Sequence, residues 1–440
     1  MNVRELTLAL LSDYEVSGKY VNLSLSSHIT DRLSREERGF LTALLYTTVE
    51  RKITYDYYIG AISGRSLDKI DSRALNILRI GMCQLVHIDS VPDHAAVNET
   101  VALARNPGEK SFINGVLRSA ARLKEEGKLP LPPREKKVSR YLSVAYSFPL
   151  WTVKHFISLF GEDETEKLLT RFNSARYTDL TVNLTKTSKD GLMSLLSKEG
   201  YQPVSFLDTP MSIRLDGSVN PKNLPGFDDG LFFVQDVACA ISAEALDVNV
   251  GDSIIDVCAC PGGKSFAAAI LSRTGEVLSL DIHESKLSLI EDGAKRLCLA
   301  NIKAGECDAT KPIEKLFKSF DRVICDVPCS GLGVLAKKPD IRHKDNESLQ
   351  NLPKLQYEIL TASANYLKDD GILVYSTCTL NPEENERIVE RFLAENREFC
   401  TVDFAVGDIS SKNGIITLLP HVHGTDGFFI AKIKRIKQLS

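Results

Sequence analysis

The sequence predicts an α/β protein: a doubly wound parallel sheet, preceded by a small α+β subdomain and an all-α bundle. Apolar residues recur at helical spacing as far as about residue 123, and short helices then alternate with strand-like runs. Beyond residue 230, apolar strands alternate with segments of helical period, which is typical of a parallel sheet. We expect a helical domain at 1–126, a linker at 127–138, the α+β subdomain at 139–230 and the sheet at 231–440.

The first domain is expected to be a bundle because its apolar residues lie three or four positions apart. Leu75, Leu78, Met82 and Leu85 show this spacing, and glycine and proline residues separate the helical segments. Residues 127–138 contain three prolines and present no hydrophobic face, which favours an extended linker.

Basic residues are concentrated near this linker although the whole chain carries a net charge of −4. Residues 101–140 contain ten Lys or Arg against four acidic residues. Such an excess can neutralise nucleic-acid phosphates. Judged by composition alone, however, a solvated helix face followed by a basic linker is the more common explanation.

The composition also limits the compartment and the class of protein. Hydrophobic residues make up 43% and charged residues 25%, and no apolar run of about 18 residues occurs, so a membrane protein is not expected. The N-terminus lacks the pattern of a secretory signal. Ten cysteines without a disulfide framework fit a reducing, cytoplasmic location. No cysteine pair has the spacing of a zinc site, and no metal is expected.

The α+β subdomain and the sheet are predicted from individual runs of residues. Helices are expected at 152–173 and 188–199, and strands at 180–184 and 211–215. The main sheet is expected to contain the apolar runs 254–258, 277–281, 323–327 and 372–376. Two last runs, 414–418 and 427–433, are expected to form an antiparallel hairpin at the sheet edge.

The first strand of the predicted sheet ends in a glycine turn, Asp-Val-Cys-Ala-Cys-Pro-Gly-Gly-Lys-Ser, at residues 256–265. Gly262 and Gly263 would let a ligand approach the main-chain N–H groups at the start of the next helix. The spacing is not Gly-x-Gly-x-x-Gly, and Pro261 lacks a donor, so a nicotinamide dinucleotide is disfavoured.

Acidic residues follow the next two strands. Asp281 and Asp308 lie where a carboxylate accepts hydrogen bonds from ribose hydroxyls, although an Asp in this position is also a common helix N-cap. Acids that recur in register beside a glycine turn favour a nucleoside cofactor.

Two cysteines follow the last two strands. Cys329 lies in Asp326-Val-Pro-Cys-Ser-Gly-Leu-Gly, and Cys378 in Ser376-Thr-Cys-Thr-Leu-Asn-Pro-Glu-Glu-Asn-Glu. Because these strands are expected to be neighbours, both thiols should face one crevice. A thiol near its ordinary pKa needs help to ionise, and Lys264 or the helix after Pro382 is a candidate. Other cysteines are expected to be small buried hydrophobes: Cys83, Cys239, Cys298, Cys325 and Cys400.

These motifs, together with Phe-Val-Gln-Asp at 233–236, resemble the Nop/Sun family of RNA 5-methylcytosine methyltransferases over residues 140–435. The front end, through its runs at 71–80, 91–101 and 112–118, is similar to the NusB-type RNA-binding fold. The resemblance implies a Rossmann-like class I methyltransferase sheet and a NusB-like bundle. It also implies methyl transfer from S-adenosylmethionine to C5 of a cytosine in small-subunit (16S) ribosomal RNA. A monomer that binds neither DNA nor membrane is expected.

The resemblance also implies roles for the site residues. Cys378 would attack cytosine C6, Asp326 would bind the N3/N4 edge of the base, and Cys329 would assist loss of the C5 proton and release of the enzyme. Lys264 would orient the substrate, lower the pKa of Cys378 or hold the cofactor carboxylate. Asp281 would bind the ribose, Asp308 the adenine region and Asp326 the methionine end. The cofactor would also lie along the turn formed by Cys258, Ala259, Cys260, Pro261, Gly262, Gly263 and Lys264.

Two positions depart from the family pattern, and two other functions remain open. Cys260 stands where the family usually has alanine. In the segment 337–343, His343 stands in place of an aromatic residue and would either stack on RNA or lie in an exposed loop. The alternatives are a DNA cytosine methyltransferase with Cys329 as nucleophile, and a non-catalytic NusB-like RNA-binding or assembly protein. The NusB-type resemblance shifts the basic stretch toward RNA contact.

Overall fold

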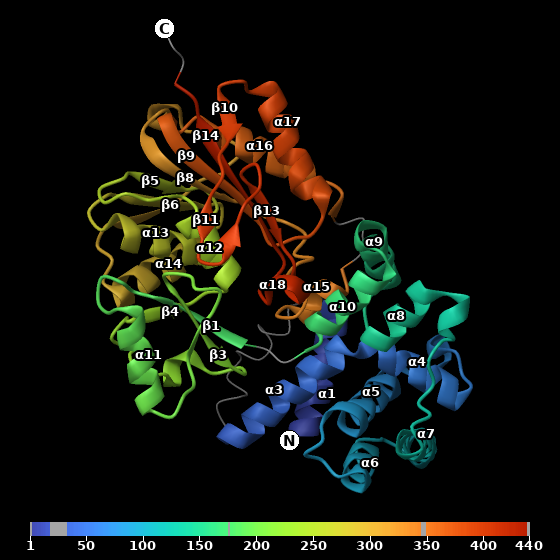
Figure 1. Ribbon diagram of the computed structural model, residues 1–440. Helices are drawn as coiled ribbons and strands as arrows, with labels where there is room; N and C mark the ends of the chain where they lie inside the picture. The colour runs from blue at the N-terminus through green and yellow to red at the C-terminus, as the bar shows by residue number, and fades with distance from the viewer. Residues whose placement is uncertain (1, 18–32, 175–176, 345–348, 438–440) are drawn as a thin grey trace. The chain divides into compact units, whose positions relative to one another are not determined.

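The computed structural model describes residues 2–17, 33–174, 177–344 and 349–437. The chain forms two compact units, one made of residues 1–173 and 338–344, the other of residues 174–337 and 345–440. Each unit is described by itself (Figure 1). Within the described ranges, no helix is both long enough and apolar enough to span a bilayer.

The first unit is helical. The elements are α1 (Val3–Ser17), α3 (Arg35–Glu50), α4 (Lys52–Ser63), α5 (Ser72–His87), α6 (Asp93–Val101), α7 (Pro107–Glu125), α8 (Val138–Tyr146), α9 (Leu150–Phe160), α10 (Glu162–Phe172) and α15 (Pro339–Arg342). Helix α5 begins where Asp71 caps the main-chain N–H groups of Arg73 and Ala74. It packs against α1, α3, α4, α6 and α7 and buries Leu78 and Met82 completely, so the predicted helical spacing marks the core of the bundle.

The segment between α7 and α8 contains a short 3-10 turn, η3 (Arg134–Lys136). Arg134 in this turn makes two hydrogen bonds, of 2.8 and 2.6 Å, to the carboxylate of Glu166 in α10. Helices α9 and α10, which the sequence grouped with the α+β subdomain, belong to the first compact unit.

The second unit contains a small antiparallel sheet of order β2-β3-β1-β4. Its strands are β1 (Tyr177–Val182), β2 (Val204–Ser205), β3 (Ser212–Asp216) and β4 (Phe232–Val234), and α11 (Lys189–Lys198) follows β1. The side chains of Leu180, Ile213, Leu192 and Phe232 form part of one core cluster. Arg214 of β3 is also buried, and it donates to both oxygens of Asp179 in β1, at 2.6 and 2.9 Å.

The large sheet has the order β10-β14-β9-β8-β5-β6-β7, and β13 pairs with β14. Strands β5 to β9 all run parallel, whereas β14 pairs antiparallel with β9, and β10 pairs antiparallel with β14. The strands are β5 (Ile254–Asp256), β6 (Val277–Asp281), β7 (Ile302–Glu306), β8 (Phe320–Asp326), β9 (Leu367–Thr377), β10 (Phe399–Thr401), β13 (Ile415–Leu418) and β14 (Phe428–Arg435). Two short strands, β11 (Ala405–Val406) and β12 (Ile409–Ser410), form a separate ladder.

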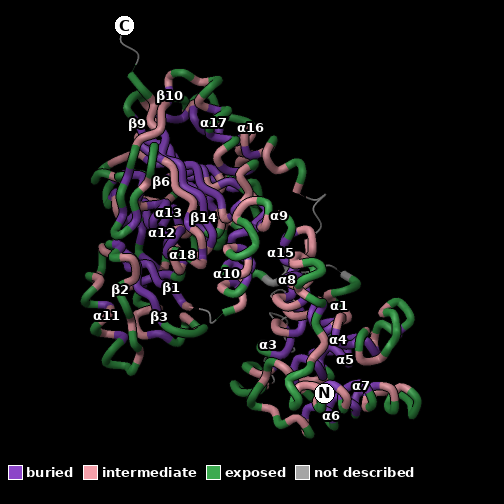
Figure 2. Tube along the Cα trace, turned by 45° about the vertical axis from the view of Figure 1, so that its right-hand side comes forward, coloured by how far each residue is buried: buried purple, intermediate pink, exposed green. Residues whose placement is uncertain are grey.

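Helices cover both faces of the large sheet, as a doubly wound fold requires. They are α12 (Val237–Glu244), α13 (Gly263–Ser272), α14 (Glu284–Leu297), α16 (Leu352–Ala364) and α17 (Glu386–Glu395); a short helix, α18 (Pro420–His423), precedes β14. Alternate residues of one strand enter different cores. Ile254 belongs to the cluster that contains Ile270 of α13, and Ile255 to the cluster that contains Leu360 of α16. Figure 2 shows the buried residues following the strands of this sheet. The predicted fold class is confirmed.

The C-terminal hairpin is confirmed. Strands β13 and β14 pair antiparallel, β14 joins the hairpin to β9, and β13 lies at the edge of the sheet together with β10, which also pairs with β14. The β14 residues Ile430, Ala431 and Ile433 are fully buried. Such an apolar strand would be a liability at an edge, and β10, which the sequence did not predict, pairs with its outer side.

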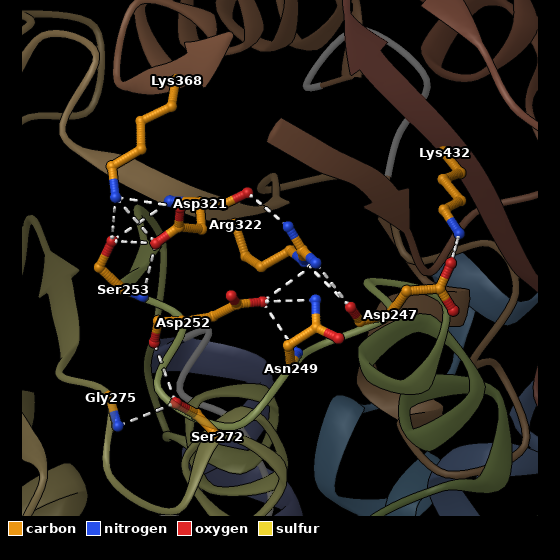
Figure 3. A network of polar contacts seen from close by, with 10 residues as sticks. All are labelled: Asp247, Asn249, Asp252, Ser253, Ser272, Gly275, Asp321, Arg322, Lys368 and Lys432. Carbon is orange, nitrogen blue, oxygen red and sulfur yellow. Dashed lines mark hydrogen bonds and ion pairs between the residues drawn. The ribbon is translucent and has the colours of Figure 1, made fainter. Parts of the chain in front are cut away.

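A polar network fixes the strand ends that are remote from the carboxyl ends of the sheet (Figure 3). Lys368 Nζ lies 2.9 Å from Asp321 Oδ2, and this contact joins the start of β9 to the start of β8. Arg322 Nη2 lies 3.0 Å from Asp252 Oδ2 and donates to the main-chain oxygen of Asp247 at 2.7 Å. The network joins the strand starts, so we assign it a structural role.

Candidate active site

Two thiols meet at the carboxyl ends of β8 and β9. The strands are parallel neighbours, and Asp326 pairs in register with Ser376. Each chain then turns within a few residues, which brings Cys329 Sγ to 3.1 Å from Cys378 Sγ. Both cysteines are partly buried. One small reactant could therefore contact both sulfur atoms.

An ion pair between a buried lysine and a partly exposed aspartate lies beside these thiols. Lys264, in the first turn of α13, places Nζ 2.6 Å from Asp326 Oδ2, and Ser376 Oγ donates to Asp326 Oδ1 at 2.7 Å. Burial disfavours the charged ammonium, but the Asp326 carboxylate outweighs this effect and raises the pKa of Lys264. Lys264 is therefore a fixed cation held by Asp326.

The two sulfurs differ in their surroundings. The hydrogen bond with Cys378, followed by burial, raises the pKa of Cys329 well above its ordinary value. The charges of Glu384 and Asp326 add to this effect. Cys329 is therefore held as a thiol at neutral pH, where it can hydrogen-bond to the sulfur of Cys378.

Close main-chain packing fixes the loops that carry the thiols. Gly333 N donates to Cys378 O at 2.9 Å, and Gly427 N donates to Gly333 O at 2.9 Å. A Cβ atom on Gly333 would lie 1.9 Å from Gly427 O, so a larger residue would force the loops apart. This glycine therefore lets the loop after β8 lie against the end of β9.

The glycine turn after β5 leads directly into α13. Gly262 has φ of 109°, and a Cβ there would lie 2.5 Å from the Phe266 ring, so glycine is required. Gly262 is the N-cap of α13, and no side chain in the described structure caps this helix end. The first main-chain N–H groups of α13 are thus suited to an anionic group, such as the carboxylate of an amino-acid cofactor.

Some of the main-chain N–H groups that were expected to bind the cofactor already donate hydrogen bonds within the protein. Ala259 N donates to Leu280 O at 2.8 Å and Gly262 N to Ala259 O at 2.7 Å. Cys260 N donates to Asp281 Oδ2 at 3.0 Å. These bonds hold the turn in shape, so the amides at the start of α13 are the better candidates for ligand contact than those from Cys258 to Gly262.

The acidic residues after β5, β6 and β7 differ in their environments. Burial raises the pKa of Asp256 to about 7, and its Oδ1 has no hydrogen-bond partner in the described structure. Asp281 accepts from Cys260 N and from His283 N, both at 3.0 Å, but it is not an N-cap, because α14 is capped at His283. Its carboxylate fits a ribose hydroxyl next to the glycine turn.

Asp308 is tied within its own loop. Its Oδ1 accepts from Thr310 Oγ1 at 2.7 Å and Thr310 N at 3.1 Å, and Oδ2 lies 3.0 Å from Lys311 Nζ. The Thr310 hydroxyl, aided by Lys311, lowers the pKa of Asp308 to about 2. Asp308 is ionised at neutral pH and shapes this turn.

Sequence reasoning missed one buried carboxylate near the thiols, Glu384, which is fully buried in the turn after Cys378. It lies in the acidic run Asn-Pro-Glu-Glu-Asn-Glu at 381–386, and no feature of that run distinguishes it from the exposed Glu383. Two other expectations need correction. Cys298 is exposed instead of buried. His343 lies neither in an exposed loop nor on a free face, because it is partly buried and its Nε2 is 2.8 Å from Val49 O.

This arrangement defines a class of protein. A doubly wound sheet with an uncapped glycine turn after β5, an acid after β6 and polar side chains after β8 and β9 is the architecture of a Rossmann-like protein that binds a nucleoside cofactor.

Comparisons with known proteins specify the family. The model of the 16S rRNA methyltransferase RsmB/F family matches residues 243–434, the NusB family model matches residues 1–122, and a ferredoxin-like domain model of RsmF/B-like methyltransferases matches residues 148–221. A probable ribosomal RNA small subunit methyltransferase B from Synechocystis is 36% identical over 99% of this chain and 100% of that protein. The Escherichia coli ribosomal RNA small subunit methyltransferase B is 31% identical over 92% of each chain.

A solved methyltransferase homologue from Pyrococcus horikoshii is 26% identical, with a TM-score of 0.60 over 68% of this chain and 99% of that one. The chain belongs to the RsmB/F family of 16S rRNA methyltransferases.

Proposed function

We propose that this enzyme transfers a methyl group from S-adenosylmethionine to C5 of a cytosine in small-subunit (16S) ribosomal RNA, through an adduct between Cys378 and C6. The observation that carries the proposal is the pair of sulfur atoms 3.1 Å apart, beside the Lys264–Asp326 ion pair. Small-subunit ribosomal RNA is the substrate in the names of the relatives, which align with nearly the whole chain.

The cofactor supplies an electrophilic methyl group. Its amino-acid carboxylate would be bound by the uncapped start of α13, and its ribose by Asp281. The fit rests on the N-terminus of α13, which no side chain caps in the described structure. Asp326, at the end of β8, would lie between the methionine end and the target base.

The chain's own groups then account for the attack. Cytosine C5 is a weak nucleophile, and addition of the Cys378 thiolate to C6 converts C5 into an enamine carbon that can accept the methyl group. Asp326 would accept a hydrogen bond from the exocyclic amino group. Lys264, 2.6 Å from Asp326, would supply positive charge to the ring edge, where negative charge develops during addition.

Cys329 would act in the second half of the reaction. Its pKa is raised first by its hydrogen bond with Cys378, and formation of the C6–S bond removes that partner. Cys329 can then lose its proton to water and take the proton from C5. The C5=C6 bond reforms, the C6–S bond breaks, and Cys378 leaves as a thiolate. One proton is released per methyl group transferred.

RNA would reach the enzyme with the target base unstacked, because a stacked base shields C6 from attack. In the first unit, exposed basic residues of α7 provide a surface for the phosphate backbone. Lys110, Arg118 and Arg122 are exposed along this helix. We propose that they contact RNA.

The test is methyl transfer to unmodified small-subunit ribosomal RNA with tritium-labelled S-adenosylmethionine. Nuclease digestion followed by chromatography should give labelled 5-methylcytidine with the wild-type enzyme, and no label with Cys378→Ala. Bisulfite sequencing of ribosomal RNA from cells that lack the protein should show one lost methylcytidine. Label in another nucleoside would refute the proposal.

A further inference from the structure

Glu384 is a buried carboxylate that the proposed chemistry does not use. It ends the 3-10 turn η7 (Pro382–Glu384) and is 0% exposed. Burial of a carboxylate is costly unless its oxygens are satisfied by hydrogen bonds. The partners that meet this cost therefore indicate what the side chain does.

The two oxygens of Glu384 face different loops. Oε2 accepts from Ser330 N at 2.8 Å, and Ser330 directly follows Cys329. Oε1 accepts from Asn381 Nδ2 at 3.1 Å and from Thr379 Oγ1 at 3.4 Å, and Thr379 directly follows Cys378. One carboxylate thus spans the residues that come immediately after the two thiols.

Further bonds close the connection between the loops. Ser330 Oγ lies 2.7 Å from Thr379 Oγ1. From α16, Gln356 Nε2 reaches both Glu384 Oε2 and Pro328 O, each at 2.9 Å. Tyr375 OH donates to the main-chain oxygen of Glu384 at 2.7 Å. Glu384 is therefore held from β9 through its main-chain oxygen and from α16 through its carboxylate, while the same carboxylate contacts both thiol loops.

The negative charge of Glu384 also acts on the nearby thiol of Cys329. Its side-chain hydrogen-bond partners named above are all neutral donors, so the negative charge is not cancelled by a bonded cation. This charge is one of the causes that raise the pKa of Cys329. A neutral side chain of the same size would leave Cys329 easier to ionise.

We propose that Glu384 is a positioning residue, whose buried carboxylate holds the loops of Cys329 and Cys378 together so that both sulfurs reach one cytosine. The inference rests on the proposed function for its catalytic meaning. Its geometric part, the spacing of the sulfurs, can be tested without any substrate.

Two variants of Glu384 separate the effect of its charge from the effect of its side-chain length, and a variant of Glu383 is the control. Glu384→Gln keeps the length but turns one acceptor oxygen into an NH2 group that faces donors, whereas Glu384→Asp keeps the charge and shortens the side chain. Glu383→Gln makes the same chemical change at the exposed neighbouring position.

The first readout is cross-linking of the thiols by diamide, which oxidises a pair of adjacent thiols to a disulfide. Wild type and Glu383→Gln should give the Cys329–Cys378 disulfide rapidly, and Glu384→Asp, which keeps the charge near Cys329, should give it at least several-fold more slowly. Equal rates in these three proteins would overturn the proposal. Mass spectrometry of the linked peptides identifies the product.

The second readout is single-turnover methylation of RNA. Displacement of the loops by about 1 Å should lower the rate about a hundredfold in Glu384→Gln, while the Kd for S-adenosylmethionine stays within about twofold. The pH–rate profile of Glu384→Gln should also shift to lower pH, because the charge near Cys329 is gone, and that of Glu384→Asp should not shift. A loss of rate that comes with weaker cofactor binding, or with the same pH–rate profile in Glu384→Gln and Glu384→Asp, would indicate a merely structural role and contradict the proposal.

A misfolded variant is recognised by thermal unfolding and by cofactor binding. If Glu384→Gln fails in either, Asn381→Ala removes one bond to Oε1 from a partly buried residue, and a smaller loss of both cross-linking and rate is expected. Unchanged behaviour of Asn381→Ala and Glu384→Asp together would overturn the proposal. If wild type cross-links but transfers no methyl group, the proposed function fails, and the cross-linking comparison still decides the role of Glu384.

Discussion

Lys264 Nζ lies 2.6 Å from Asp326 Oδ2, and this contact joins the start of α13 to the end of β8. The lysine was expected to orient the substrate, to act on the Cys378 thiol or to hold the cofactor carboxylate. These roles stay predictions, and the contact with Asp326 places a fixed cation behind the residue that we propose binds the base. The pair therefore links the cofactor turn and the proposed base-binding edge in one electrostatic unit.

Removal of one partner of this pair should cost more than removal of both. Lys264→Met leaves the Asp326 carboxylate without its cation and should lower the free energy of unfolding by about 2 kcal/mol, since Asp326 is partly exposed. Lys264→Met combined with Asp326→Asn should recover at least half of that loss. Urea denaturation of the three proteins and wild type measures the coupling. Additive losses would show that the pair is not coupled.

The protonation of Cys329 should depend on Cys378. Because the hydrogen bond with Cys378 is the largest cause of its raised pKa, Cys378→Ala should lower that pKa and expose more thiolate. Alkylation of Cys329 by iodoacetamide at pH 8 should then be faster in Cys378→Ala, by about tenfold for each pKa unit. Mass spectrometry measures the rate. The exposed Cys298 is an internal control that should react equally in both proteins, and an unchanged rate at Cys329 would contradict the assignment.

The sequence showed which strands form the site, but not how the side chains pair. Hydrophobic periodicity predicted the alternating strands and helices of a doubly wound sheet, and the usual strand order of such a sheet predicted that β8 and β9 are neighbours. The contact between Lys264 and Asp326 joins residues far apart in the sequence, so no local sequence pattern predicts it.

Each miss has its own local cause. Strand β10 contains only Phe399–Thr401, too few residues for a period to be visible, so it was not predicted. Cys298 follows α14 in the left-handed conformation, with φ of 58°, which turns the chain outward at a position where composition alone suggested burial. Glu384 looked like one acid among several. Only its contacts distinguish it from the exposed Glu383.

The buried Asp256 should make stability depend on pH. Burial raises its pKa to about 7, whereas an unfolded Asp titrates near 4, so the folded state binds a proton that the unfolded state has lost in this range. The free energy of unfolding contributed by this group therefore falls as pH rises from about 4 to about 7. The free energy of unfolding of Asp256→Asn, relative to that of wild type, should therefore rise by on the order of 3 kcal/mol between pH 4 and pH 8.

Urea titrations of both proteins at several pH values test this prediction. Asp228→Asn, the same change at an exposed position, should show no such gain. A constant difference between Asp256→Asn and wild type would mean that Asp256 is ionised throughout the range.

The basic face of α7 should contribute to RNA affinity. Lys110→Glu combined with Arg118→Glu should weaken binding of small-subunit ribosomal RNA about tenfold, and should reduce the slope of log Kd against log salt. Filter binding at several salt concentrations measures both quantities. Arg35→Glu combined with Arg38→Glu makes the same charge change on exposed positions of α3. Equal losses in both double variants would mean that α7 carries no specific RNA surface.

The central claim is that Cys378 forms the bond to the base. RNA that contains 5-fluorocytosine cannot lose the group at C5, so the adduct should accumulate and survive denaturation. Digestion with nuclease and protease, followed by mass spectrometry, locates the modified residue. The account predicts a methylated 5-fluorocytidine on the peptide that contains Cys378, and persistence of the adduct in Cys329→Ala. A nucleoside attached to Cys329, with an adduct that survives in Cys378→Ala, would contradict it.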